Sequence, residues 1–483
     1  MSTRAGALTA RASAAPARTA AALWLAAALI SGFTLRRFLG PLDEGILMQA
    51  ASRMADGQWP WRDFGWSYGP GQPLAVFALG QLFEPSLLWW RLLRVAADAT
   101  AAVLVWALVR EHRPRWAPAA WAAAALTAAQ PTSANPTAPA LAFALGAVYA
   151  ATRGRPAWAG VLAALAAFWR PDMGAVAALA AVVTILVARR DEGDATRPAL
   201  TCALVAAGAL LLLYSPFLVA AGPATVWDAL VVQATRDGEW WRLPFPDWFG
   251  GGDAKDFLAW LAPYAALVTL ALALPRKHAA GLVVLGAGAA VYYVSRADLE
   301  HAQGLLIVAA ALAALIRPRA FGAAVLALLI VVGAGNRASA LLRPPDLAPF
   351  GEVRVPPDEA AALPRVIEAV HRLVPPGEPI YVAPRRSDLV TFSNPLIHYL
   401  AGRPNVLRRD VLLQAKPDEQ RKIVNALRRA RPKAIVRWTA PESAKPEPNR
   451  RGRPSGSTAL DDYLAAAYTL DTRAGDYEVL RPR

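Results

Sequence analysis

The stretch PLDEGILMQAASRMADGQWPWRDFGWSYGPG, residues 41–71, directly follows the first apolar segment and carries two adjacent carboxylates, Asp43 and Glu44, near its start. A helix-compatible run continues to about Asp56, and a series of aromatic residues then leads to a Gly-Pro-Gly stop. Acids at a membrane edge followed by an aromatic belt suit a site that meets both lipid and a polar substrate. The alternative is an ordinary interfacial loop with solvated acids and anchoring tryptophans.

The composition predicts a membrane protein with many spans. Of 483 residues, 55% are hydrophobic and only 18% are charged, which is more apolar surface than a soluble protein needs. The net charge of +15 does not indicate nucleic-acid binding, because much of the arginine stands in short loops between apolar segments, where it sets topology. The single cysteine, Cys202, excludes a disulfide framework and a cysteine-based metal site.

The sequence contains about eleven apolar segments, whose lengths we compare with the roughly 20 residues that a helix needs to cross a bilayer. Their approximate limits are 20–35, 87–109, 116–130, 138–151, 157–169, 173–188, 199–220, 257–274, 279–294, 303–316 and 320–341. Residues 71–84 are too short to span and are expected to form a helix at the interface. We therefore predict a mainly α polytopic domain over residues 20–341, with residues 1–19 as a cytoplasmic N-terminus.

Every second connection between these segments is short and basic, and basic connections face the cytoplasm. The residues concerned are Arg110, Arg113, Arg115, Arg153, Arg155, Arg189, Arg190, Arg197, Arg276, Lys277, Arg317 and Arg319. The other connections then lie outside an inner (plasma) membrane and carry the acids Asp43, Glu44, Asp172, Asp298 and Glu300. This arrangement predicts one outward-facing cavity shared by several loops. Alternatively, outer loops look acidic merely because they lack the basic bias.

The composition changes after about Arg343, where prolines form a linker and no later segment is apolar enough to span. Residues 342–483 are predicted to form a small extracytoplasmic α/β domain of a size that can hold its own core. We expect helices at 358–373 and 420–429 and strands at 379–383, 434–438 and 477–480. The insert 441–457, rich in Pro, Lys, Arg and Ser, predicts a mobile loop.

Two later clusters join the acidic pair as candidate chemistry, and both stand where a span ends. They read Trp169-Arg170-Pro171-Asp172 and Ser295-Arg296-Ala297-Asp298-Leu299-Glu300-His301. A guanidinium suits bidentate contact with phosphate, and a nearby carboxylate can accept a proton from a hydroxyl or amine nucleophile. Arg91 either lines the same cavity or snorkels to headgroups. For each Arg-Asp pair the alternative is a local ion pair that caps a helix, and for His301 it is a plain hydrogen-bonding role.

These clusters predict transfer of a sugar from an anionic lipid-linked donor, held by arginines at the outer face, to an acceptor activated by a carboxylate. Direct displacement with one base would invert the anomeric centre. A transporter or flippase for a lipid-linked sugar is the competing hypothesis, although transporters often show repeated halves and midplane charges. A scaffold whose basic tail binds cell-wall polymer is a third.

Three motifs in order after the first span resemble the GT-C membrane glycosyltransferases, of the protein-mannosyltransferase and lipid A aminoarabinose transferase type with an Rgt-like branch. They are Asp43-Glu44-Gly45, Gly57-Gln58-Trp59-Pro60-Trp61-Arg62-Asp63 and Tyr68-Gly69-Pro70-Gly71. Arg170-Pro171-Asp172 and Arg296-Ala297-Asp298-x-x-His301 also resemble family features, and the resemblance covers roughly residues 20–340.

The resemblance implies a hexosyl- or pentosyltransferase with a polyprenyl-phosphate sugar donor, a glycan, lipid or protein acceptor, and catalysis on the non-cytoplasmic side. It makes Asp43 the catalytic base, with Glu44 beside it. The motifs and the charged residues at span ends together give the candidate substrate-binding residues Asp63, Tyr68, Arg91, Arg170, Asp172, Arg296, Asp298 and His301. The second outer loop, residues 131–137, lacks the acid that several members carry, so the requirement for a divalent metal stays open, and Asp172 is the candidate to take the place of that acid.

Overall fold

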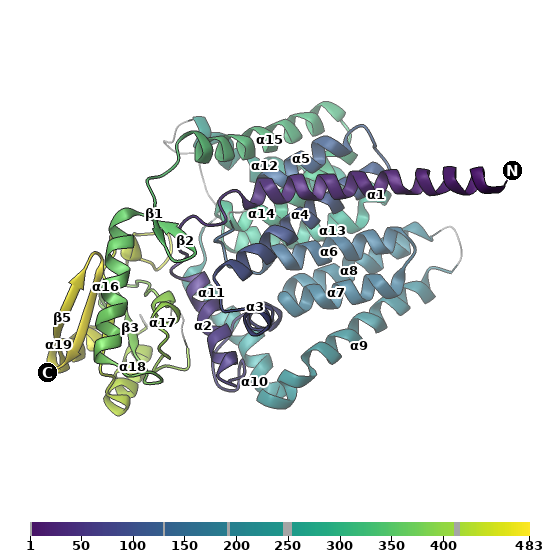
Figure 1. The fold of residues 1–483 in the computed structure, drawn as a ribbon. Helices are drawn as coiled ribbons and strands as arrows, with labels where there is room; N and C mark the ends of the chain where they lie inside the picture. The colour runs from purple at the N-terminus through teal and green to yellow at the C-terminus, as the bar shows by residue number, and fades with distance from the viewer. Residues whose placement is uncertain (1, 129–130, 191–193, 245–253, 410–415) are drawn as a thin grey trace.

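The computed structural model describes the chain except residues 1, 129–130, 191–193, 245–253 and 410–415, and it shows a helical bundle with a mixed α/β region at one end (Figure 1). The long elements of the bundle are α1 (Ser2–Gly32), α4 (Leu88–Arg110), α5 (Ala117–Thr127), α6 (Thr137–Thr152), α7 (Pro156–Trp169), α8 (Pro171–Ala188), α9 (Thr196–Ala221), α12 (Ala254–Ala273), α13 (Ala280–Ser295), α14 (Leu299–Leu315) and α15 (Arg319–Leu342). Shorter elements are α2 (Asp43–Ala55), α3 (Gly71–Leu82), α10 (Pro223–Trp227), η1 (Asp228–Val232), α11 (Gln233–Trp241) and η2 (Lys277–Ala279).

Within the described residues, each apolar segment predicted from the sequence is helical over most of its length, and residues 71–82 form the expected short helix α3. Within the described residues, five helices are long and apolar enough to cross a membrane: Leu88–Arg110, Pro171–Ala188, Thr196–Ala221, Lys277–Ser295 and Arg319–Leu342. The other predicted spans are shorter apolar helices. The prediction of a mainly helical multi-pass membrane protein is confirmed, and the number of spans stays a prediction.

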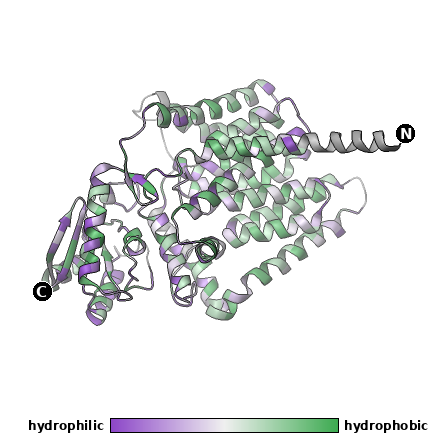
Figure 2. Ribbon diagram, viewed as in Figure 1, coloured by the Kyte–Doolittle hydropathy of each residue, from purple (hydrophilic) through white to green (hydrophobic). Residues whose placement is uncertain are grey.

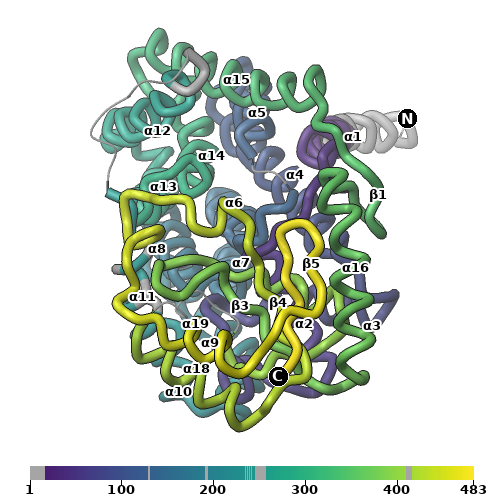
Figure 3. The backbone as a smooth tube through the Cα atoms, turned by 90° about the vertical axis from the view of Figure 1, so that its left-hand side faces the viewer, coloured from purple at the N-terminus to yellow at the C-terminus, as the bar shows by residue number. Residues whose placement is uncertain are grey.

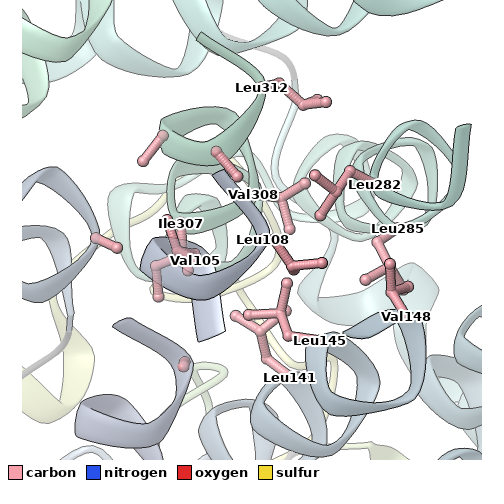
Figure 4. Close-up of a cluster of buried hydrophobic side chains, with 14 of the residues drawn as sticks. Val105, Leu108, Leu141, Leu145, Val148, Leu282, Leu285, Ile307, Val308 and Leu312 are labelled. Carbon is pink, nitrogen blue, oxygen red and sulfur yellow. The ribbon is translucent and has the colours of Figure 1, made fainter. Parts of the chain in front are cut away.

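Helix α14 is the centre of the bundle, because it is buried on every side from Leu305 to Leu315. A helix that is apolar all round belongs in a core. Its side chains Ile307, Val308 and Leu312 pack with residues of α4, α6 and α13 (Figure 4). Alanine supplies much of the remaining contact surface, which lets neighbouring helices approach closely. The first turn of α14 is therefore held in a fixed position at one end of the bundle.

The C-terminal region is more hydrophilic than the bundle (Figure 2) and contains a four-stranded sheet of order β3-β4-β6-β5. The β3–β4 pair is parallel and the other pairs are antiparallel. Its elements are β1 (Ala348–Phe350), β2 (Val353–Val355), α16 (Pro357–Leu373), β3 (Tyr381–Ala383), α17 (Leu396–Leu400), α18 (Pro417–Ala430), β4 (Ile435–Trp438), η4 (Pro441–Ala444), α19 (Ala459–Ala467), β5 (Tyr468–Ala474) and β6 (Tyr477–Pro482). All predicted elements of this region are present, whereas β5, α17, α19 and the β1–β2 hairpin were not predicted.

The C-terminal region lies over the end of the bundle that carries α2 (Figure 3). A Cβ added to Gly45 in the Asp-Glu-Gly motif would lie 2.4 Å from the backbone nitrogen of Leu396, so only glycine fits this contact. The carboxylate of Glu352 accepts hydrogen bonds from the Ser86 hydroxyl (2.8 Å) and the Leu87 amide (3.1 Å) just before α4.

The opposite end of the bundle collects the basic connections. The rings of His112 and His278 lie 4.9 Å apart, and Arg153 pairs with Glu111 at 3.0 Å. The predicted acidic and basic connections thus gather at different ends, as an alternating topology requires. Which end faces the cytoplasm follows from the excess of arginine and stays a prediction.

Candidate active site

The glycine-rich end of the opening motif docks against the end of α7. The Gly69 amide donates to the Trp169 carbonyl at 3.1 Å, and a Cβ at Gly69 would lie 2.2 Å from the Phe168 carbonyl oxygen. Only glycine allows this approach of two backbones. The Tyr-Gly-Pro-Gly motif therefore brings Tyr68 beside Arg170, the residue that follows α7.

Arg170 is held in a fixed orientation between α7 and α8. Its Nε and Nη2 donate to the two oxygens of Asp172 at 3.1 and 2.6 Å, and its Nη1 donates to the Thr137 hydroxyl at 2.9 Å and to Asn135 at 3.3 Å. The Arg170 side chain is 6% exposed, whereas that of Asp172 is 57% exposed. The pair thus presents a buried guanidinium next to a solvated carboxylate.

Aromatic rings connect Arg170 to the start of α14. The guanidinium carbon lies 4.2 Å from the ring centre of Tyr292 and 5.7 Å from that of Tyr68, in the range of cation–π contact. The Tyr292 hydroxyl accepts a hydrogen bond from the Asn135 amide at 2.9 Å, and its ring lies 5.0 Å from that of His301. The tips of α8 and α14 therefore share one site.

Asp298 caps α14 and organises the third cluster. One oxygen accepts from the His301 amide at 2.8 Å and lies 2.7 Å from Nδ1 of the same residue, while the other accepts from Arg296 at 3.0 Å. These contacts hold the pKa of the Asp298 carboxyl below its usual value despite the opposing effect of burial. Arg296 also reaches Glu447 of the C-terminal insert at 3.3 Å.

Asp43 stands in the first turn of α2 and lines a cavity of about 630 Å³ together with Glu300 and Gln303. Its side chain is exposed to solvent through the cavity, although many protein atoms lie around it. Partial burial among these atoms raises the pKa of the Asp43 carboxyl, and the Glu300 carboxylate raises it further, whereas His301 and Arg296 oppose the shift. A carboxylate with a raised pKa is a better proton acceptor.

Tyr68 lies within electrostatic reach of both halves of this arrangement. Burial raises the pKa of its hydroxyl, Tyr292 and Asp43 raise it further, and Arg170 opposes them. The clusters that stand at residues 43, 170 and 296 in the sequence are thus brought together at one end of the bundle.

Glu44, expected beside Asp43 in catalysis, takes a different place. Its two oxygens accept from Nε and Nη2 of Arg91 at 2.7 and 2.8 Å, and both side chains are fully buried. Arg91 donates further to the backbone carbonyls of Leu35 and Phe38. Arg91 was expected to line the cavity. Its contacts instead indicate a structural role, because the Glu44–Arg91 pair joins α2 and α4 to the end of α1.

Asp63 is also set apart from the cluster. It accepts from the Trp59 amide at 2.8 Å and pairs with Arg62 in a local turn at the surface. These contacts hold the pKa of the Asp63 carboxyl below its usual value. No contact between Asp63 and the cluster occurs among the described residues, so its placement suits a turn-forming role.

The Glu44–Arg91 pair leads to a stability prediction. Glu44→Gln leaves a buried guanidinium without its counter-ion, which typically costs about 3–5 kcal/mol. We expect a lower unfolding temperature in detergent and less folded protein in the membrane. Asp63→Asn is the matched control, because an exposed pair contributes about 0–1 kcal/mol. Equal unfolding temperatures for Glu44→Gln and the control would contradict the structural role.

Three participants were not recognised from the sequence: Asn135, Thr137 and Tyr292. None is charged, and each gains its role only through contacts with Arg170. Asn135 and Thr137 stand in the outer loop noted for having no acid, and the Asn-Pro-Thr spacing at a helix start was the one available signal. In the described part of the chain, no group of three or more His, Cys, Asp or Glu side chains is placed to hold a metal ion.

Comparison with known proteins identifies solved structures with a similar fold. No family model matches the chain, and no curated protein sequence matches it. The solved structures that match include ArnT from Cupriavidus metallidurans bound to undecaprenyl phosphate (TM-score 0.53, 14% identity, 97% of each chain) and the same protein in the apo state (TM-score 0.51, 14% identity, 98% of each chain). The chain therefore has the fold of ArnT, a GT-C fold.

Proposed function

We propose that this protein is a glycosyltransferase that moves a sugar from a polyprenyl-phosphate donor to an acceptor on the extracytoplasmic side of the membrane. The observation that carries the proposal is the convergence of Asp43, Arg170 and Arg296 at one end of the bundle. A proton acceptor and two guanidiniums are the groups that such a transfer needs. The likeness in fold to ArnT, which was crystallised with undecaprenyl phosphate, supports a donor of this class.

An apolar groove suits the lipid part of the donor. The groove, of about 530 Å³, lies along α4, α6 and α7 and reaches from Trp169, next to Arg170, to Arg153 at the basic end. Its other lining residues are almost all apolar, including Leu93, Phe143 and Leu162. A prenyl chain in this groove would place its phosphate near the positively charged Arg170, where the phosphate competes with Asp172 for the guanidinium.

In the proposed reaction, the acceptor hydroxyl oxygen bonds to the anomeric carbon of the sugar as the bond from that carbon to the phosphate oxygen breaks. The hydroxyl proton passes to the Asp43 carboxylate, and the leaving polyprenyl phosphate takes the electron pair of the broken bond. Arg170 and Arg296 stabilise the charge that develops on the phosphate. One base on the face opposite the leaving group inverts the configuration of the sugar.

The test is direct. Purified protein in nanodiscs receives a radiolabelled polyprenyl-phosphate sugar and extracts of membrane and cell-envelope acceptors, and release of polyprenyl phosphate is measured together with label in the acceptor fraction. We expect both to rise together. Movement of intact donor across a vesicle membrane without loss of sugar would instead favour a flippase and overturn the proposal.

The contact between Arg296 and Glu447 leads to a further prediction. Glu447 occupies part of the Arg296 guanidinium, and Arg451 and Asn449 hold its carboxylate at 2.6 and 2.9 Å. A donor phosphate would compete with it. We expect Glu447→Gln to lower the donor KM by about fivefold, because a partly exposed pair is worth about 1 kcal/mol. Glu419→Gln, on the surface of α18, is the control, and a raised donor KM in Glu447→Gln would show that Glu447 instead assists binding.

A further inference from the structure

Arg94 of α4 is a buried arginine that the proposed reaction leaves without a role. Its side chain is 3% exposed and lines neither the cavity beside Asp43 nor the apolar groove. Its Nη1 donates to the backbone carbonyls of Ser133 at 2.8 Å and Asn135 at 3.2 Å, in the loop before α6. This nitrogen carries two N–H donors, so it can serve both carbonyls at once. Arg94 therefore holds the backbone of this loop.

The charge of Arg94 is balanced by acids. Asp98, one turn along α4, lies 3.8 Å from its Nε, and the charge of Glu300 also reaches the guanidinium. Its Nη2 donates to the Gln303 side chain of α14 at 3.2 Å. Charged groups inside a membrane protein normally pair, and the two acids meet that need. The hydrogen bonds to neutral carbonyls therefore fix the loop and do not neutralise the charge.

The loop that Arg94 holds carries Asn135, whose side chain joins Arg170 to the start of α6 and to the end of α13. Its Oδ1 accepts from Arg170 at 3.3 Å and from the Thr137 amide at 3.1 Å, and its Nδ2 donates to the Tyr292 hydroxyl at 2.9 Å. Asn135 is thus bonded to Arg94 through its backbone and to Arg170 through its side chain. A shift of the loop would change both sets of contacts together.

Two further buried side chains fix the same loop. Trp90 Nε1 donates to the Ser133 carbonyl at 3.1 Å, and Gln72 Nε2 donates to the Ala134 carbonyl at 2.5 Å. Three successive carbonyls are therefore held by side chains from α3 and α4, and the loop cannot turn without leaving buried polar groups unpaired. Of these three side chains, Arg94 is the one that contacts two of the carbonyls.

We propose that Arg94 is a positioning residue of the donor site, which fixes Asn135 so that Arg170 presents its guanidinium to the phosphate of a polyprenyl-phosphate donor. The inference rests on the proposed function, because it takes Arg170 as the phosphate-binding group. In this role Arg94 contacts no substrate and acts through the loop. A residue of this kind changes the affinity of the site, whereas a residue that only stabilises the fold changes the amount of folded protein.

Binding of radiolabelled undecaprenyl phosphate to the full chain in nanodiscs gives both the Kd and the number of sites, and so separates these two roles. Arg94→Lys keeps the positive charge beside Asp98 but loses the planar fork of donors. We expect its Kd to rise by about tenfold, within the range of coupling between residues of one hydrogen-bond network, while the number of sites stays near that of wild type. Arg94→Gln should raise the Kd at least as much, and Arg94→Lys decides the matter if Arg94→Gln does not fold.

Ser31→Ala is the matched control for Arg94→Lys. It removes a buried hydrogen bond of 3.0 Å to Asp98 in the same network, but Ser31 does not contact the loop. We expect the Kd of this variant to equal that of wild type, even if less protein folds. A wild-type Kd in Arg94→Lys, or an equal rise in Kd in Ser31→Ala, would overturn the proposal.

A double variant shows whether the effect passes through the loop. Asn135→Ala removes the side chain that joins the loop to Arg170 and should itself raise the Kd. Adding Arg94→Lys should then raise it by less than about twofold more, because the connection is already broken, and full additivity would overturn the proposal. Arg170→Gln separates the two possible failures. If it leaves the Kd unchanged, the proposed donor site is wrong and the inference with it, whereas a raised Kd in Arg170→Gln alone would count against the role of Arg94 only.

Discussion

Asp43→Asn is expected to lower sugar transfer by about 10²–10⁴-fold, the usual contribution of a general base, while the donor KM changes by less than about threefold. The amide has nearly the shape of the carboxylate but cannot accept the acceptor proton. Release of labelled polyprenyl phosphate under saturating donor measures the effect. Asp63→Asn, which alters a carboxylate in a surface turn 20 residues along the chain, should keep nearly full activity. Equal turnover in wild type and Asp43→Asn would remove Asp43 as the base.

The pH dependence of the same reaction follows from the raised pKa of Asp43. The carboxylate form accepts the proton, so kcat/KM in wild type should rise as pH rises through a pKa above the ordinary value of 3.8 and then reach a plateau. In Asp43→Asn the residual activity should lack this rise. A wild-type profile that is flat across the acidic range would contradict the assignment.

The same shift has a consequence for stability. Because the fold raises the pKa of Asp43, the folded state holds the proton more tightly than the unfolded state, and stability is lost as pH rises through the folded pKa. At neutral pH the ionised side chain therefore opposes folding. Asp43→Asn should unfold at the same or a higher temperature than wild type, whereas Glu44→Gln should unfold at a lower one. The two variants separate a catalytic from a structural carboxylate at adjacent positions.

Sequence patterns predicted the bundle well, because hydropathy over a span sums many residues and does not depend on the partners of the helix. They also predicted that the clusters at residues 43, 170 and 296 lie close together, since all three stand in connections on the same side of the predicted membrane. The motif glycines show why a pattern can carry this information. Gly45 and Gly69 both allow backbones to touch, one against α17 and the other against the end of α7.

The sequence did not predict that the adjacent residues Asp43 and Glu44 have different roles. Successive residues of a helix point about 100° apart, so Asp43 and Glu44 cannot share one environment. Which of them faces the cavity depends on Arg91, 47 positions later, and no local pattern carries that pairing. The contact of Glu447 with Arg296 spans 151 positions and starts from an insert whose composition predicted mobility. Such long-range contacts are fixed by tertiary packing alone.

Arg170→Gln is expected to raise the donor KM by about 10–100-fold, because hydrogen bonds to a charged group contribute about 1.5–3 kcal/mol. Glutamine removes the positive charge and the planar pair of donors that suit a phosphate. The fold should survive, since the partner Asp172 is 57% exposed and stays solvated when its counter-ion is removed. Binding of labelled donor and the kinetics of its turnover measure the effect, and the unfolding temperature checks the fold.

Two further variants define what Arg170 contributes. Arg170→Lys keeps the charge but not the fork that spans Asp172, Thr137 and Asn135, so it should recover only part of the lost affinity. Arg115→Gln, which removes an exposed charge from the connection between α4 and α5 at the opposite end of the bundle and does not touch the groove, should leave the donor KM unchanged. If Arg170→Gln lowers kcat with the donor KM intact, the guanidinium acts only in the transition state. If neither kcat nor the donor KM changes, the phosphate is bound elsewhere, and Arg170 only forms a local ion pair at the start of a helix.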